Sequence, residues 1–229
     1  MERIAEEILE QLNTDDVFSF TVGGYTIGVS ESVVVSWIVI GIVLILCLIL
    51  TANLKVKNIS RRQALAEWLV VKGEAFVGEM VGEEGKEYVP YLLTVLIFIG
   101  FSNTIGLFGF KPPTKDLNVT AALALMSIIV VQVAAIRKKH LGGWLKGFTQ
   151  PVALVTPINV LELGIKPLSL CMRLFGNVLG AFVIMELLKA VVPAFIPAVF
   201  SLYFDIFDGL LQAYVFVFLT GLYIKEAME

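Results

Sequence analysis

Residues 33–52 read VVVSWIVIGIVLILCLILTA and contain no charged side chain. The hydrocarbon core of a bilayer is about 30 Å thick, and a helix needs about 20 consecutive apolar residues to cross it. The stretch therefore predicts a membrane-spanning helix. Basic residues follow it at once and mark its cytoplasmic end, because cytoplasmic loops carry an excess of lysine and arginine; they are Lys55, Lys57, Arg61 and Arg62. The charged, partly periodic segment 60–87 predicts a helix at the membrane interface.

The composition of the whole chain agrees with a membrane protein. Of its 229 residues, 58% are hydrophobic and 16% are charged, whereas a typical soluble domain has about 45–50% and about 25%. A soluble globule of this size cannot bury so much apolar surface, which excludes an ordinary soluble enzyme and a disordered chain. A net charge of −3 offers no basic surface to nucleic acid. Cys47 and Cys171 fit neither a disulfide framework nor a metal-ligand spacing, so we expect no metal and no cofactor.

Four further apolar stretches predict membrane spans at 88–109, 119–136, 150–191 and 197–224. A second basic cluster, Arg137 to His140, ends the third of them. With the N-terminus outside, the cytoplasmic segments hold eleven lysines and arginines and the external segments hold four. We therefore predict an all-α polytopic membrane protein with about five crossings, whose last two spans form a long helical hairpin.

The N-terminal segment has a different character from the rest. We expect residues 1–31 to lie outside the membrane and residues 32–229 to form a single membrane domain. Apolar residues at helical spacing predict a short amphipathic helix over 2–12. The segments 17–22 and 25–29 alternate apolar and polar residues on either side of a Gly-Gly pair, which predicts a small β-hairpin.

Charged side chains gather in the last two spans, whereas the first three are almost free of them. They are Glu162, Lys166, Arg173, Glu186, Asp205 and Asp208. Each costs at least ~2.5–3.5 kcal/mol at mid-membrane, so each should pair or face water. Glu162 and Lys166 are four residues apart, which predicts a structural ion pair on one helix face. Arg173 has no acid three or four residues away and stays charged at any workable pH, so its partner must come from another helix or another subunit.

The last span carries a polar stripe. Asp205, Asp208 and Gln212 are spaced three and four residues apart, which in an α-helix places them within about 60° of one another. Such a stripe in an apolar helix is typical of the lining of a water-filled passage. The alternatives are buried ion pairs that hold helices together and, near Asp205, a helix end at the membrane interface.

One run in the fourth span carries a family resemblance. Pro167-Leu-Ser-Leu-Cys-Met-Arg-Leu-Phe-Gly-Asn177 resembles the signature of subunit a of F-type ATP synthases. Four other segments resemble the same family in the same order, and the resemblance covers about residues 30–229. These segments are Asn103-Thr-Ile-Gly-Leu107, Asp116-Leu-Asn-Val-Thr120, Pro157-Ile-Asn-Val-Leu-Glu162 and Gln212-Ala-Tyr-Val-Phe-Val-Phe-Leu-Thr220.

The resemblance implies a membrane stator that faces a rotating ring of c subunits, each carrying a carboxylate at mid-membrane. The last two helices would form a tilted hairpin along the ring. Two aqueous half-channels would deliver protons or sodium ions to and from the ring carboxylates, with Arg173 standing between them. Gln212 matches the family's glutamine, which can hydrogen-bond to the arginine or to a carboxylate. Asn177 lies one turn from Arg173 on the same face.

The sequence departs from the family pattern at one position. Many members carry an acid nine residues after the arginine, where this chain has Phe182. Glu186 lies one helical turn further, about 6 Å along the axis, and is the expected replacement. We assign Glu186, Asp205 and Asp208 to the external half-channel.

The resemblance also implies the surroundings of the chain. Its partners would be the c-subunit ring, the peripheral-stalk subunit b, the remaining ATP synthase subunits and the lipid bilayer, with no nucleic acid. It would have no catalytic site of its own and would be a multi-pass protein of the bacterial plasma (inner) membrane. The alternative function is a stand-alone cation channel or secondary transporter. That function would favour a selectivity ring or inverted repeats, which the sequence does not contain.

Overall fold

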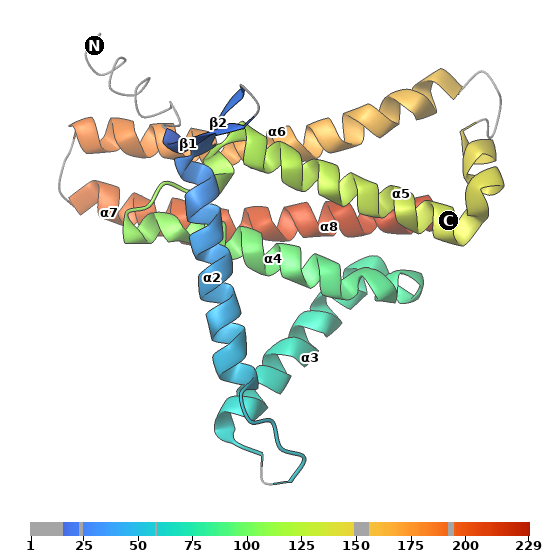
Figure 1. The fold of residues 1–229 in the computed structure, drawn as a ribbon, viewed down its shortest axis with the longest axis horizontal. Coiled ribbons are helices and arrows are strands. Elements are labelled where there is room, and N and C mark those ends of the chain that lie inside the picture. Colours follow the sequence, from blue (N-terminus) through green and yellow to red (C-terminus); the bar gives the residue numbers. More distant parts are fainter. Residues whose placement is uncertain (1–15, 23–24, 58, 149–155, 192–194) are drawn as a thin grey trace. The chain divides into compact units, whose positions relative to one another are not determined.

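The computed structural model describes residues 16–22, 25–57, 59–148, 156–191 and 195–229. Within them, five helical stretches are long and apolar enough to cross a membrane, which confirms the predicted all-α membrane fold. They can be followed along the chain by colour in Figure 1. The stretches are α2 (Glu31–Thr51); η1 (Glu83–Tyr88), α4 (Val89–Thr104) and η2 (Ile105–Phe108); α5 (Leu117–Gly147); α6 (Thr156–Val191); and α7 (Phe195–Ser201), η5 (Leu202–Asp208) and α8 (Gly209–Met228).

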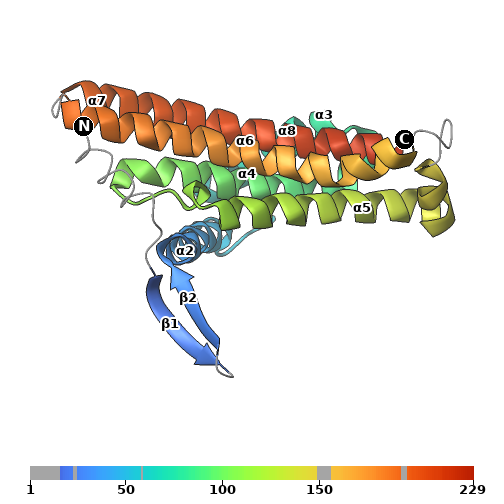
Figure 2. The same ribbon diagram turned by 90° about the horizontal axis from the view of Figure 1, so that it is seen from above.

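The N-terminal β-hairpin is present as predicted. Strand β1 (Asp16–Val22) pairs antiparallel with β2 (Tyr25–Ser30), which leads directly into α2. Figure 2 shows the two strands side by side at the start of α2. The helix expected over residues 2–12 lies outside the described residues.

The charged segment after the first span forms a helix, as its periodicity predicts. Helix α3 (Arg61–Val81) begins after Ser60, whose hydroxyl accepts a hydrogen bond from the Gln63 amide at 3.3 Å. A side-chain oxygen at the N-cap satisfies one of the donors that the first helical turn leaves unpaired. The Gln63 side chain also binds both backbone groups of Lys55 at 2.9 and 3.0 Å, which fixes the turn before the helix.

The third spanning helix is longer than predicted. The basic cluster at 137–140 does not end α5, which continues to Gly147 with one non-helical residue, His140, at φ 59° and ψ 163°. Trp144 Nε1 donates to Gln132 Oε1 at 2.9 Å, so the segment after His140 folds back on the helix before it. The prediction failed because basic residues mark the edge of a membrane, whereas a helix can continue through them.

The chain divides into two compact units. Unit 1 comprises residues 1–44, 98–120 and 173–213, and unit 2 comprises 45–97, 121–172 and 214–229. In unit 1, Val35, Val39 and Ile105 form a buried apolar cluster. In unit 2, Gly221 allows α8 to approach Val81 closely, since a Cβ at this glycine would lie 3.2 Å from a Val81 methyl group.

The last two spans are paired within each unit, as a helical hairpin requires. In unit 1, Asn177 of α6 donates to Gln212 of α8 at 2.7 Å. In unit 2, Lys166 of α6 binds Glu226 of α8 at 3.0 Å.

Candidate functional site

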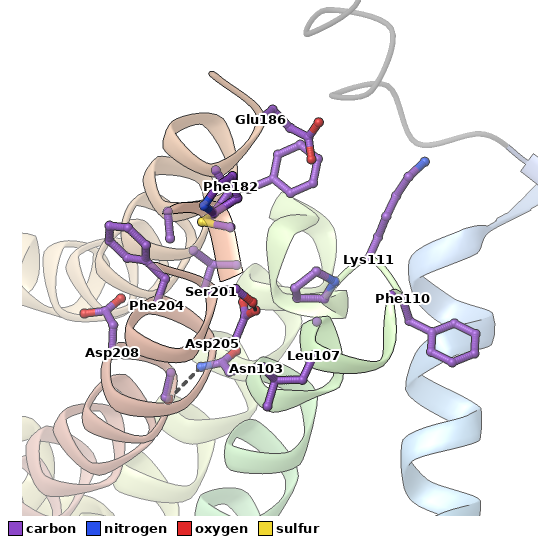
Figure 3. Close-up of a pocket in the computed structure, with 18 of the residues that line it drawn as sticks. Asn103, Leu107, Phe110, Lys111, Phe182, Glu186, Ser201, Phe204, Asp205 and Asp208 are labelled. Atoms are coloured by element: carbon purple, nitrogen blue, oxygen red, sulfur yellow. Dashed lines mark hydrogen bonds between the residues drawn. The ribbon is translucent and has the colours of Figure 1, made fainter. Parts of the chain in front are cut away.

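Unit 1 contains a cavity of about 650 Å³. Its wall is formed by three segments: the end of α4 with the loop that follows it, the second half of α6, and the stretch from α7 through η5 to the start of α8. Glu186, Asp205 and Asp208 all line it (Figure 3). The structure thus brings together the three acids that the sequence assigns to one passage.

Asp205 lies against the backbone of the α4 side of the cavity. Its carboxylate accepts a hydrogen bond from the Ser201 hydroxyl at 2.6 Å. A Cβ added at Gly106 would stand 2.9 Å from Asp205 Oδ1, closer than two such atoms normally come. The absence of a side chain at position 106 therefore lets this carboxylate reach its place.

The predicted polar stripe is interrupted at its start. Residues 202–208 form a π-helix rather than an α-helix. A π-helix has more residues per turn, so two acids three residues apart no longer share one face. Figure 3 shows Asp205 and Asp208 on different sides of this segment, although both line the cavity. Gln212 is buried in α8 and binds Asn177 instead of lining the cavity.

The cavity acids differ in how their charges are met. Glu186 forms an ion pair with Lys189 at 2.8 Å, and its side chain is 17% exposed. Asp208 forms no hydrogen bond or ion pair with any residue that the structure describes. Because an isolated carboxylate is costly away from water, Asp208 is the acid that most needs a wet cavity.

A buried asparagine holds the cavity wall together. Asn103 donates to the backbone oxygen of Gly209 at 2.9 Å and accepts from the Thr114 hydroxyl at 2.6 Å. It thereby joins the end of α4 to the start of α8 and to the loop before α5. The sequence contained Asn103 in a segment of the family resemblance but gave it no role. Its polarity within an apolar span was the available signal, since buried amides are almost always hydrogen-bonded.

The loop before α5 places a lysine that sequence reasoning counted only as an external charge. Lys115, in η3 (Pro113–Lys115), is 5% exposed, and its Nζ lies 3.8 Å from the ring centroid of Phe182. Burial and, second, the charge of Lys111 lower the pKa of Lys115 to about 8, against the opposing effects of Glu31 and Glu186. Lys111 itself is paired with Glu31 at 3.0 Å.

Arg173 lies exposed on α6 and forms no hydrogen bond or ion pair with any described residue. One turn further, Asn177 donates to Gln212 Oε1, and Gln212 is 2% exposed. The Gln212 Nε2 group is buried and has no partner among the described residues. A buried donor without a partner costs about 1–3 kcal/mol, so this amide is suited to an acceptor from outside the described chain.

The ion pair expected in the fourth span is present in unit 2. Lys166 Nζ lies 3.4 Å from Glu162 and 3.0 Å from Glu226, and it also lies 5.3 Å from the ring centroid of Tyr223. The sequence predicted the first contact from its spacing of four residues. It missed Glu226, which is distant along the chain and comes from α8.

Comparison with known proteins identifies the family. A family model described as "ATP synthase A chain" matches residues 33–225. The chain belongs to this family. The resemblance of residues 167–177 to subunit a of F-type ATP synthases is therefore confirmed, and with the five apolar helices it makes the chain an integral membrane protein.

Curated relatives of the ATP synthase A chain family cover most of the chain. It is 38% identical over 203 residues to ATP synthase subunit a of Moorella thermoacetica, covering 87% of this chain and 91% of that protein. It is 37% identical over 213 residues to the chloroplastic subunit a of Oedogonium cardiacum, covering 87% and 82%. It is 33% identical over 226 residues to the sodium ion specific subunit a of Propionigenium modestum, covering 90% and 76%.

Proposed function

We propose that the chain is the ion-translocating stator subunit of an F-type ATP synthase. Two half-channels carry protons or sodium ions to and from the carboxylates of a rotating c-subunit ring, and Arg173 separates them. Family membership supports the complex. The observation that carries the mechanism is the acidic cavity, because Glu186, Asp205 and Asp208 line one space in the unit that also holds Arg173.

The cavity serves as the external half-channel. One water molecule occupies about 30 Å³ of the liquid, so about 650 Å³ is ample for a hydrated path. Carboxylates along such a path attract cations and can bind and release protons. Lys111, Lys115 and Lys189 lie around the same region of unit 1 and belong to the few bases that the charge bias places outside.

Arg173 controls the charge of each ring carboxylate that passes it. A nearby guanidinium favours the ionised carboxylate, so the carboxylate releases its ion to one half-channel. Beyond the arginine the carboxylate faces lipid, where the charged form is too costly, so it must first be reloaded from the other half-channel. Ions then cannot cross without rotation. The unpartnered Nε2 of Gln212 supplies a neutral donor for the same carboxylate.

The remaining features of the proposal follow from this role. Moving one charge through 100 mV is worth about 2.3 kcal/mol, so several ions are needed for each ATP. The chain itself has no catalytic site and no cofactor. Its partners are the c-ring, subunit b and the other ATP synthase subunits, in the plasma membrane of a bacterium.

The decisive experiment replaces Arg173 by alanine in the whole complex, reconstituted into liposomes. We expect ion-driven ATP synthesis to fall by about 100-fold or more, because an uncompensated charge in the membrane costs at least ~2.5–3.5 kcal/mol. Arg173→Lys should rescue little, since an ammonium can lose its proton when desolvated and lacks the planar fork of donors. The matched control is Arg137→Ala, which removes another exposed arginine and should leave the rate unchanged. Near-normal synthesis by assembled Arg173→Ala complexes contradicts the proposal.

A further inference from the structure

Lys115 places a buried ammonium group beside the acidic cavity. Its side chain is 5% exposed and its Nζ lies 3.8 Å from the ring centroid of Phe182, a residue that lines the cavity. Lysine is almost never this buried unless its charge is compensated. The negative face of the Phe182 ring supplies part of that compensation and fixes the ammonium against α6.

Charged groups from every neighbouring element surround Lys115. They are Glu31 at the start of α2, Lys111 and Asp116 in the same loop, and Glu186 and Lys189 on α6. These groups are held in place: Glu31 pairs with Lys111 at 3.0 Å and Glu186 with Lys189 at 2.8 Å. Asp116 accepts hydrogen bonds from the Asn118 amide at 2.9 Å and from the Ser30 hydroxyl at 3.4 Å.

The balance of these charges depends on Lys115. Three acids and two bases leave one net negative charge, which the ammonium of Lys115 cancels. When that ammonium is neutral, the region beside Glu186 carries one net negative charge. The protonation state of a single buried side chain thus decides whether this wall of the cavity attracts a cation.

We infer that Lys115 sets the cation affinity of the cavity beside Glu186 and increases it when the medium outside becomes alkaline. The inference rests on the proposed function, since it takes the cavity as the path by which the translocated cation arrives. Lys115 is a positioning residue in this mechanism, because it acts on the cation through the local charge and not by binding it.

The direction of the pH dependence follows from burial. Because burial lowers the pKa of Lys115 to about 8, the side chain is mostly charged at pH 7 and mostly neutral at pH 9. The wall is therefore neutral at pH 7 and negative at pH 9. Cation uptake gains affinity in the pH range where protons are scarce.

Two substitutions separate the charge of Lys115 from its packing. K115R keeps a positive charge at every workable pH, because the pKa of arginine exceeds about 12. K115Q is neutral at every pH. The whole complex carrying each variant is reconstituted, and ATP synthesis is driven by a fixed membrane potential while the pH on the cavity side is varied from about 6.5 to 9.5. Lys57→Arg, at an exposed lysine of unit 2, is the matched control.

We expect the two variants to differ from wild type on opposite sides of pH 8. K115R should match wild type at pH 7 and fall about three- to tenfold below it at pH 9, the effect of one unit charge about 8 Å away at an effective dielectric constant between those of protein and water. K115Q should match wild type at pH 9 and be at least as active at pH 7. Loss by the same factor at every pH in both variants shows a purely structural role and overturns the inference, as do variants that follow wild type throughout.

A third variant in the same assay distinguishes failure of this inference from failure of the proposed function. E186Q/D205N/D208N removes all three cavity acids. If it lowers synthesis while the Lys115 variants follow wild type, only the inference fails. If it leaves synthesis unchanged, the cavity is not the cation path and the proposed function itself loses its support.

Discussion

The charged side chains of α6 and the last helical stretch are compensated in unit 2 and largely uncompensated in unit 1. In unit 2, Lys166 binds Glu162 and Glu226, whose side chains are 48% and 55% exposed. In unit 1, Arg173 and Asp208 form no hydrogen bond or ion pair with any described residue. A charge that its own chain compensates joins helices, whereas an uncompensated charge in an apolar helix requires water or another subunit.

The comparison separates stability from transport. Partly exposed ion pairs contribute only about 0–1 kcal/mol, so the Lys166 cluster of unit 2 should matter modestly for stability and little for ion movement. The acids of unit 1 carry a desolvation cost without a matching ion pair, except for Glu186 with Lys189. Their substitution should therefore change transport strongly while the protein still folds.

The largest effect within this comparison is expected from the triple variant E186Q/D205N/D208N. The amides keep the size of the side chains but cannot bind a proton or attract a cation, so synthesis by the reconstituted complex should fall about tenfold or more. Single substitutions should cost less, because three carboxylates line the same cavity. The matched control is E162Q/E226Q in unit 2, which should stay within about twofold of wild type. Equal losses in the two variants would remove the distinction between the two sets of charges.

Water access gives a second way to test the comparison. In a background without Cys47 and Cys171, Asp205→Cys and Asp208→Cys should react with an impermeant thiol reagent added from outside, because both positions line the cavity. Ala213→Cys is the control. Ala213 is 1% exposed and does not line the cavity, so its rate should be at least about tenfold lower, since only a thiol reached by water forms the reactive thiolate. Reaction at 205 and 208 only after detergent is added contradicts an external half-channel.

The sequence predicted the fold well because the membrane imposes a simple rule. Apolar length fixes the spans, and α2 differs from the predicted 33–52 by two residues at its start and one at its end. The rule failed where other forces decide, as at His140, where α5 turns instead of ending. The π-helix at 202–208 was also missed, since apolar periodicity does not distinguish it from an α-helix.

The candidate site was predicted in its acids but not in its supports. Glu186, Asp205 and Asp208 were identifiable because a carboxylate in an apolar span is rare and costly. Asn103 and Lys115 were not, because their roles depend on contacts between segments distant along the chain: Asn103 with Gly209, and Lys115 with Phe182. A single sequence contains no information about which distant segments meet.

The place of Asp205 provides a smaller test of the unit 1 cavity. A methyl group at position 106 would lie 2.9 Å from Asp205 Oδ1, so Gly106→Ala should push the carboxylate out of its place. We expect synthesis to fall about two- to fivefold, less than in the triple variant, because Glu186 and Asp208 remain. The control is Gly41→Ala, since a Cβ at Gly41 meets nothing within 4 Å. An unchanged rate in Gly106→Ala shows that the exact place of Asp205 does not matter for transport.

The smallest effect on transport is expected in unit 2, from Lys166→Met. The substitution keeps the apolar stem against Tyr223 but removes the charge that lies between Glu162 and Glu226. The two carboxylates then repel each other, and we expect a lower midpoint of thermal unfolding by about 2–4 °C, equivalent to about 1 kcal/mol. Synthesis should stay within about twofold of wild type, because the lysine stabilises a helix pair and does not contact the translocated ion. Lys166→Arg, which restores the charge, should recover the midpoint. If Lys166→Met abolishes synthesis without lowering the midpoint, the cluster takes part in ion movement, and compensation by the chain's own charges no longer separates structural from functional groups.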